Sequence, residues 1–240
     1  MSLSAVFGKD RTNPDESSHW MSVSDLMSGL MIVFLFIAVV FMRHVAIERD
    51  KIKEVAVTYH QNQTEIWRAL EAEFATDLER WNAHIDGSTL EVRFQNPDVL
   101  FEIGSSRLRP AYEKVLADFF PRYLAVVGRF RDSIEEVRIE GHTSSAWNSG
   151  TTTDVAYFRN MRLSQDRTTA TLEYIQGLPE VASEHEWIRR HVSAIGYSSS
   201  RLVLDETGAE NPARSRRVTF RVVTNAETQI RRILDLEPVG

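Results

Sequence analysis

The stretch Leu26–Met42, LMSGLMIVFLFIAVVFM, contains no charged residue and decides how the chain is organised. Together with Met21–Ser24 it reaches the length needed to cross a bilayer, whose hydrocarbon core is ~30 Å thick, as a helix. No basic segment precedes it and no Ala-x-Ala site follows it, which disfavours a cleaved secretory signal. We therefore expect an uncleaved transmembrane helix over residues 20–43, with Trp20 as an aromatic anchor at the membrane interface.

The overall composition excludes several classes of protein. The 240 residues are 42% hydrophobic and 26% charged, which is a globular balance and not that of a disordered chain. The net charge of −6 disfavours a generic nucleic-acid-binding protein. Cysteine is absent, which removes thiol catalysis, disulfides and thiolate metal sites. Because no nucleophile–base set or metal-ligand spacing accompanies His142, we expect no enzyme activity, no cofactor and no bound metal.

A long charged segment follows the apolar stretch. Neither Gly nor Pro occurs between Leu30 and Asp86, so a continuous helix is predicted to Asp86. One apolar stripe runs along it at spacings of four, four, four and three residues: Ile66, Leu70, Phe74, Leu78 and Trp81. The stripe either packs on the protein's own domain or forms a parallel seam between two copies. We favour the seam, and residues 44–86 are then a helical stalk and dimerisation segment.

The periodicity changes after Asp86-Gly87-Ser88, where apolar and polar residues begin to alternate. Strands are predicted at residues 90–95, 136–140, 192–196 and 215–224. Helices are predicted from Pro110 and from Ser164, the second capped by the Ser164 hydroxyl and ending at Gly177. Strands that alternate with helices and close with a strand pair predict a two-layer α/β sandwich over residues 87–240.

Asp25 lies one turn inside the apolar helix. A charged carboxylate at the centre of a bilayer costs about 2.5–3.5 kcal/mol, and less near the end of the span. The group can avoid this cost by binding a proton, or by holding Na⁺ with help from Ser28 three residues later on the same helical face. Asp25 would then carry ions. The alternative is that Asp25 lies at headgroup depth or caps the helix.

The segment from Trp20 through Asp25-Leu-Met-Ser-Gly-Leu-Met resembles the single membrane helix of MotB-type stator subunits, with Ser28 at the usual position of Thr. This resemblance implies that Asp25 and Ser28 form the ion-translocating site. It leaves open whether the ion is H⁺ or Na⁺.

Four further motifs resemble OmpA-like peptidoglycan-binding domains. They are Phe101-Glu-Ile-Gly-Ser-Ser-Arg-Leu-Arg-Pro110, Ile139-Glu-Gly-His-Thr143, Asn160-Met-Arg-Leu-Ser-Gln-Asp-Arg167 and Ala213-Arg-Ser-Arg-Arg-Val-Thr-Phe220. The resemblance spans residues 89–225 and implies a fold with a peptidoglycan site. The binding set that it implies is Thr143, Ser144, Asp154, Asn160, Leu163 and Arg167.

The chemistry of the ligand agrees with this set. Peptidoglycan stem peptides offer carboxylates and, in diaminopimelate, an ammonium group, and Arg167 can bind a carboxylate bidentately. OmpA-like domains usually carry Asp directly after His-Thr, where this chain has Ser144, so the usual ammonium partner is missing and Asp154 is the predicted substitute. The alternative for Arg167 is a structural ion pair.

Two other groups of residues are expected to be structural. His142 is expected to be a hydrogen-bonding residue of the fold. Arg214, Arg216 and Arg217 are expected to form a solvated strand edge and not a nucleic-acid site.

The two resemblances together imply a B-type subunit of a membrane ion-driven motor in the cell inner membrane. The wall-binding domain must then be periplasmic and residues 1–19 a cytoplasmic tail, although the Lys and Arg count around the span favours the reverse orientation. The implied partners are a second copy of the chain, five copies of a multi-span A-type subunit (ZorA- or MotA-like) and peptidoglycan.

The type of motor is a separate question. The acidic tail, the core Ser24-Asp-Leu-Met-Ser28 and the uninterrupted stalk resemble ZorB, the B subunit of the Zorya anti-phage defence system, more than a flagellar stator. The alternatives are a flagellar MotB-type subunit and a passive peptidoglycan anchor tethered to the membrane.

Overall fold

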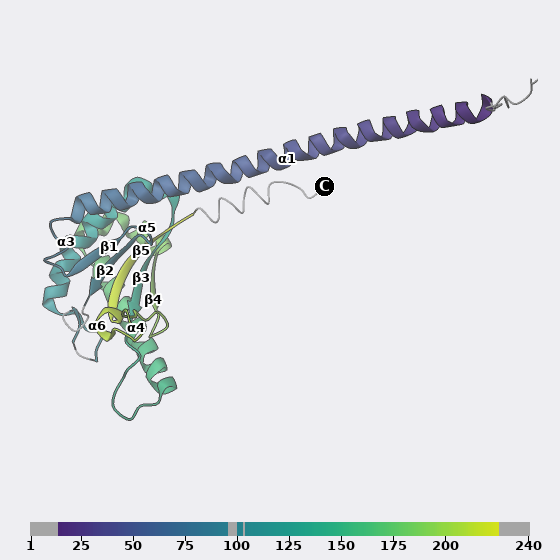
Figure 1. Ribbon diagram of the computed structural model, residues 1–240. Helices are drawn as coiled ribbons and strands as arrows, with labels where there is room; N and C mark the ends of the chain where they lie inside the picture. The colour runs from purple at the N-terminus through teal and green to yellow at the C-terminus, as the bar shows by residue number, and fades with distance from the viewer. Residues whose placement is uncertain (1–13, 96–99, 103, 226–240) are drawn as a thin grey trace, which may run out of the picture. The chain divides into compact units, whose positions relative to one another are not determined.

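A computed structural model describes residues 14–95, 100–102 and 104–225 of the chain (Figure 1). The chain divides into two compact units, Met1–Glu54 and Val55–Gly240. Helix α1 (Pro14–Phe74) begins six residues before the predicted span, so residues 14–19 are helical. The expectation that residues 1–19 form a loose tail is therefore wrong for residues 14–19, and residues 1–13 lie outside the described residues. The side chain of Trp20, the predicted interface anchor, is not among the described side chains.

The first unit exposes a long apolar helix surface. Every side chain from residue 23 to residue 47 is exposed, and large apolar groups such as Leu26 (75% exposed) and Leu35 (64% exposed) are among them. By length and composition this helix is able to cross a membrane.

The second unit contains a five-stranded sheet of order β1-β2-β5-β3-β4. All neighbouring strands are antiparallel except the parallel pair β3 and β4. The strands are β1 (Ala83–Asp86), β2 (Glu91–Gln95), β3 (Ile134–His142), β4 (Val192–Gly196) and β5 (Arg217–Thr224). The four strands predicted from alternation are therefore confirmed as β2 to β5, and β4 has the predicted bounds.

Helices cover the apolar face of this sheet (Figure 1). Helix α3 (Pro110–Val127) begins at the predicted proline, and helix α4 (Thr153–Gln176) is the crossover between the parallel strands β3 and β4. The remaining helical elements are short: η1 (Gly128–Ser133), η2 (Pro179–Glu184), α5 (His185–His191) and α6 (Pro212–Ser215). The predicted two-layer α/β sandwich is confirmed.

The apolar stripe of α1 is part of the domain core. Ile66, Leu70 and Phe74 are fully buried, and the ring of Phe74 lies 5.1 Å from that of Phe119 on α3. These side chains have no surface left for a second copy. The prediction that the stripe forms a self-association seam is therefore wrong, and the alternative, packing on the protein's own domain, is confirmed.

The predicted end of the long helix is also wrong. Helix α1 ends at Phe74, and residues 83–86, placed in the helix by the sequence analysis, form the edge strand β1. Trp81 is 6% exposed in the turn between them and packs edge-on against Phe119. The second compact unit begins at Val55.

Arg122 of α3 clamps the last turn of α1. Its Nε donates to Glu73 Oε1 at 2.7 Å, its Nη1 to Asp77 Oδ2 at 2.9 Å, and its Nη2 to the Glu73 carbonyl at 2.8 Å. The guanidinium lies 5.0 Å from the centre of the Phe74 ring. This partly desolvated guanidinium bonds several acceptors at once, and a network of this kind can contribute measurably to stability.

Candidate functional site

Helix α4 carries the predicted Asn-x-x-Leu-Ser-x-x-Arg motif and lies against the sheet at two glycines. A Cβ atom at Gly141 would lie 2.7 Å from the Ser164 carbonyl oxygen, and one at Gly196 would lie 2.5 Å from the Gln165 backbone nitrogen. Neither distance leaves room for a side chain. The two glycines therefore set the height above the sheet of every side chain that α4 directs toward it.

The motif serine joins α4 to the end of β4. Ser164 Oγ accepts a hydrogen bond from the Ser198 N–H at 3.1 Å and donates to the Met161 carbonyl at 3.0 Å. Ser198 is fully buried at φ 52°, donates its hydroxyl to the Tyr157 carbonyl and accepts from the Thr143 N–H. These bonds offset the roughly 1–2 kcal/mol cost of the left-handed conformation. Sequence analysis missed Ser198 because no glycine or motif marks it.

Asn160 holds the loop that follows β3. Its Nδ2 donates to the Ser144 carbonyl at 3.0 Å and to the Ala146 carbonyl at 3.2 Å, and the residue is 3% exposed. The structure thus brings together three of the predicted site residues, Thr143, Ser144 and Asn160. Both N–H groups of the amide serve the loop, so its oxygen is the atom left to bind a ligand.

Arg167 joins two of the predicted motifs. Its Nε donates to the Ser105 carbonyl at 3.0 Å, and its guanidinium lies 4.9 Å from the centre of the Phe101 ring. The residue is 6% exposed, and Leu163, one turn earlier, is half-buried. The Phe101–Ser105 stretch therefore positions Arg167, and helix α4, which carries it, is packed closely against the sheet at Gly141 and Gly196.

The structure does not bring Asp154 to this arginine. Asp154 lies exposed in the first turn of α4, which starts at Thr153 and not at Ser164 as predicted. Thirteen residues of helix separate Asp154 from Arg167, about 20 Å at 1.5 Å per residue. Ser164 is an interior residue of the helix and caps nothing.

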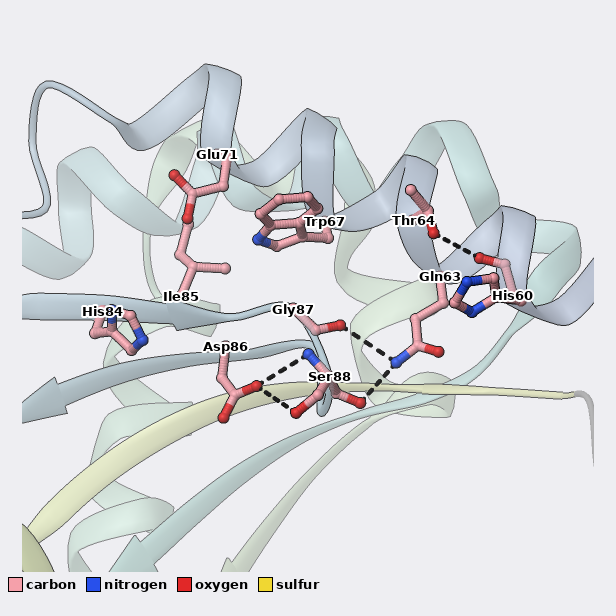
Figure 2. A pocket seen from close by; sticks show the side chains of 10 residues that line it. All are labelled: His60, Gln63, Thr64, Trp67, Glu71, His84, Ile85, Asp86, Gly87 and Ser88. Atoms are coloured by element: carbon pink, nitrogen blue, oxygen red, sulfur yellow. Dashed lines mark hydrogen bonds between the residues drawn. The ribbon is translucent and has the colours of Figure 1, made fainter.

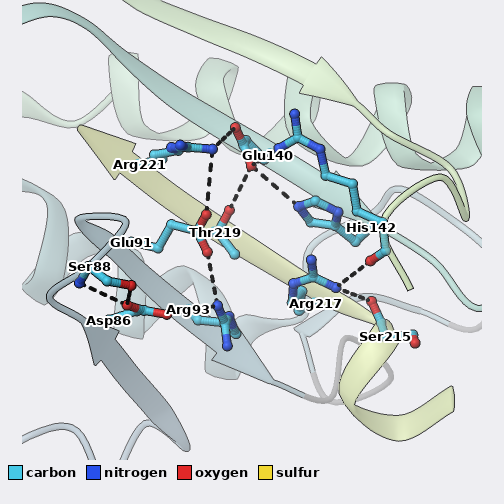
Figure 3. A network of polar contacts seen from close by, with 11 residues as sticks. Asp86, Ser88, Glu91, Arg93, Glu140, His142, Ser215, Arg217, Thr219 and Arg221 are labelled. Carbon is cyan, nitrogen blue, oxygen red and sulfur yellow. Dashed lines mark hydrogen bonds and ion pairs between the residues drawn. The ribbon is translucent and has the colours of Figure 1, made fainter. Parts of the chain in front are cut away.

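A charged cluster covers the sheet face opposite the helices, beside the loop that follows β3 (Figure 3). Glu140 is fully buried, and its Oε2 lies 3.4 Å from Arg201 Nη1 and 3.5 Å from His142 Nε2. Burial raises the pKa of Glu140, but the close contact and charge of His142, with the charges of Arg201 and Arg221, outweigh it and hold the pKa below the usual 4.5. The carboxylate is therefore ionised at neutral pH.

His142 packs in this cluster through its ring. Its imidazole stacks on Tyr197, with centroids 5.3 Å apart, and neither ring nitrogen has a hydrogen bond among the described residues. The predicted structural role is thus fulfilled by stacking and charge. Burial lowers the pKa of His142, and the neighbouring Arg217 lowers it further.

The prediction of a solvated arginine edge is wrong for Arg217. This residue is 7% exposed and donates to the Ser215 carbonyl at 2.9 Å and the Arg201 carbonyl at 3.2 Å. Burial lowers its pKa to about 10. The alternating pattern of β5 correctly predicts that Arg217 lies on the polar face of the sheet. It does not show that neighbouring side chains cover that face and bury the arginine.

The predicted ion site lies in the other unit. Asp25 and Ser28 are exposed on α1, three residues apart as predicted. The Ser28 hydroxyl donates to the Ser24 carbonyl at 2.8 Å, which leaves its oxygen lone pairs free to accept. Within the described residues, no group of three His, Asp or Glu side chains could hold a metal ion.

The second unit also contains an open groove of about 730 Å³ between α1 and strand β1 (Figure 2). Trp67 and Ile85 form its apolar part, and His60, His84 and Asp86 lie around it. Gln63 Nε2 closes one end by donating to the Ser88 carbonyl at 2.6 Å. No residue of the predicted binding set lines this groove.

Comparison with known proteins assigns the chain to a family. No family model matches it. It is, however, 52% identical over 233 residues to Zorya protein ZorB of Escherichia coli, a match that covers 97% of this chain and 99% of that protein. The chain belongs to the ZorB family. The ZorB match includes the apolar helix as well as the sheet domain, because it covers almost the whole of both chains.

Several solved structures are similar to this ZorB-family chain. A MotB-like protein from Desulfovibrio vulgaris is 23% identical, with 71% of this chain and 94% of that one covered and a TM-score of 0.49. The cell wall anchor of the T6SS from Pseudomonas aeruginosa is 22% identical over 65% and 96%, with a TM-score of 0.44. The periplasmic domain of Helicobacter pylori MotB is 16% identical over 62% and 87%, with a TM-score of 0.42.

Proposed function

We propose that this ZorB-family chain is the B-type subunit of a membrane ion-driven motor in Zorya anti-phage defence, with Asp25 as its ion carrier. The observation that carries the proposal is an acidic side chain, with a hydroxyl three residues later, on a helix whose apolar surface is exposed over residues 23–47. A carboxylate there is costly unless it binds a cation or a proton. Such a group can alternate between a charged, wet state and a neutral, dry state.

The sheet domain would be the stationary part of the motor. A rotary device produces torque only against a fixed reference, and peptidoglycan outside the cytoplasmic membrane is such a reference. The rigid seat of α4 and the loop held by Asn160 support binding of a stem peptide, whose carboxylate Arg167 would recognise. In this arrangement the chain spans the inner membrane once, with a cytoplasmic N-terminus and a periplasmic domain.

The motor would contain more than this chain. We propose two copies of it surrounded by five copies of a multi-span A-type subunit, so that each Asp25 faces protein and not lipid. Since the stripe of α1 is buried in the domain core, contacts between the two copies must involve other surfaces.

The decisive experiment is a phage challenge of cells that express the complete system with Asp25→Asn. Asparagine has nearly the same size and cannot release a proton or bind a cation by charge, so protection should fall to the level of cells without the system. Asp25→Glu, which keeps the charge, should retain part of the protection. Full protection by an Asp25→Asn protein at wild-type abundance would leave only a passive tether.

Wall binding is tested separately by sedimenting the detergent-solubilised full-length protein with purified sacculi. Arg167→Lys keeps the positive charge but loses the planar fork, and we expect retention to fall about tenfold. Arg162→Lys, on an exposed position of the same helix, is the matched control. Equal retention of both variants would exclude Arg167 from the site, and no retention of the wild-type protein would exclude wall binding.

A further inference from the structure

The loop after β3 receives a carboxylate from a distant part of the chain. The Ser145 N–H donates to Glu210 Oε1 at 3.0 Å, and the Ser145 hydroxyl donates to Glu210 Oε2. Ser145 is directly next to Ser144, whose carbonyl is held by Asn160. The Glu210 carboxylate is therefore bonded to the loop after β3, and Asn160 of α4 is bonded to the same loop at the neighbouring residue.

Glu210 is held in place by the backbone around it. It forms an antiparallel bridge with Leu204, and the turn between them is closed by hydrogen bonds from Asp205 N to the Ala209 carbonyl and from Ala209 N to Asp205 Oδ1. Gly208, at φ 81°, provides the left-handed residue that this turn requires. The position of the carboxylate is thus set by the fold and does not depend on Ser145 alone.

The charge of Glu210 is not neutralised within the part of the chain that the structure describes. Its contacts are the two neutral donors of Ser145 and the bridge to Leu204. The other half-buried or buried acids of this region are paired, Glu140 with Arg201 and Glu91 with Arg93. A carboxylate has about four acceptor positions, so two remain for a further donor.

The loop contains a second polar group without a partner. Thr143, two residues before Ser145, is 4% exposed, and its hydroxyl oxygen has no hydrogen-bond partner among the described residues. A buried hydroxyl left unpaired costs about 1–3 kcal/mol. The Glu210 carboxylate bound to this loop and the unpaired Thr143 hydroxyl within it together indicate a ligand with hydrogen-bond donors and positive charge.

We propose that Glu210 recognises the ammonium group of the diamino acid in the peptidoglycan stem peptide, an inference that rests on the proposed wall-binding function. An ammonium group has three donors and one positive charge. Ser144 carries no charge, and among the described residues no hydrogen bond joins Asp154 to this loop, whereas the Glu210 carboxylate is bonded to it. Glu210 is then a specificity-determining residue, and it selects stem peptides whose side-chain amine is free.

The test compares native sacculi with sacculi whose free amines have been converted to neutral amides by acetic anhydride. Full-length protein in detergent is sedimented with each preparation. We expect the wild-type protein to bind the acetylated wall about tenfold more weakly. Glu210→Gln keeps one oxygen that can accept a hydrogen bond from Ser145 but has no charge. It should therefore bind native sacculi about tenfold more weakly than wild type and should not distinguish the two preparations.

Two control variants separate recognition from loop structure. Ser145→Ala removes the hydroxyl donor, keeps the backbone N–H that bonds Glu210 Oε1, and keeps the charge. Glu206→Gln removes an exposed acid of the same turn. Both variants should still distinguish the two walls. The proposal is overturned if Glu210→Gln also distinguishes them as well as wild type does, or if wild type binds both equally. If wild type binds neither, wall binding itself fails.

Discussion

Replacing Gly196 by alanine should displace helix α4 from the sheet. The new Cβ would lie 2.5 Å from the Gln165 backbone nitrogen, and 2.8 Å from both the Gln165 Cα and the Ser164 Oγ. Carbon atoms prefer separations of about 3.5–4.0 Å. Because two of the three atoms belong to the backbone of α4, the helix itself has to move, by about 1 Å.

The free energy of unfolding should fall by about 2–4 kcal/mol. Overpacking of this kind costs about 1–3 kcal/mol. The shift also stretches two hydrogen bonds between Gln165 and strand β4, from Gly196 N to Oε1 at 2.8 Å and from Nε2 to the Ala194 carbonyl at 3.1 Å. Each of these contributes about 0.5–1.5 kcal/mol.

The assay is guanidinium-induced unfolding of the full-length protein in detergent, followed by tryptophan fluorescence. Gly177→Ala is the matched control, because a Cβ there lies at ordinary distances of 3.4 Å and 3.5 Å from the Tyr174 and Glu173 carbonyls. Its φ of −77° suits alanine, so its effect should stay within about 1 kcal/mol. If the two alanine variants are equally stable, the close approach of α4 to β4 does not determine the position of this helix.

Three further outcomes are expected. Arg122→Leu should lower the free energy of unfolding by about 2 kcal/mol in the same assay, since its carboxylate partners lose charged hydrogen bonds; an unchanged midpoint would contradict the clamp. Stability should fall with pH below 6.5 because the lowered pKa of His142 lets the unfolded chain bind more protons, and again below 4.5 because of Glu140. His142→Gln should flatten the first part and weaken the second, because His142 also helps to lower the pKa of Glu140; an unaltered first part would exclude His142 as its cause. Gln165→Ala should increase light scattering on incubation, because it uncovers backbone groups of the edge strand β4; clear solutions would show that other groups protect this edge.

Local patterns predicted the sheet well and the ends of the helices poorly. Residues 136–140 were placed correctly in a strand because Val137 and Ile139 alternate with charged residues. The end of α1 was missed because the segment from Ala75 to Asp86 contains no glycine or proline. There the chain leaves the helix and Trp81 and Ile85 are buried in the core. The helix ends because of this tertiary packing, which local sequence does not reveal.

The candidate site shows the same division. Asn160, Ser144 and Thr143 were predicted together from motifs, and the structure brings them together. The start of α4 was misplaced because Ser164 has the chemistry of a cap, whereas its hydroxyl serves Ser198 across the layer boundary. Glu210 could not be selected from sequence, since its position depends on a turn sixty-five residues away from Ser145.

The burial of Ile66, Leu70 and Phe74 has a mechanical consequence. The last turns of α1 share one core with α3 and the sheet, so they cannot unwind without opening that core. A pull or twist that reaches this part of the helix is resisted by the cooperative unfolding barrier of the whole domain and not by a soft linker. Any compliance in the transmission of force must therefore come from residues before Ile66.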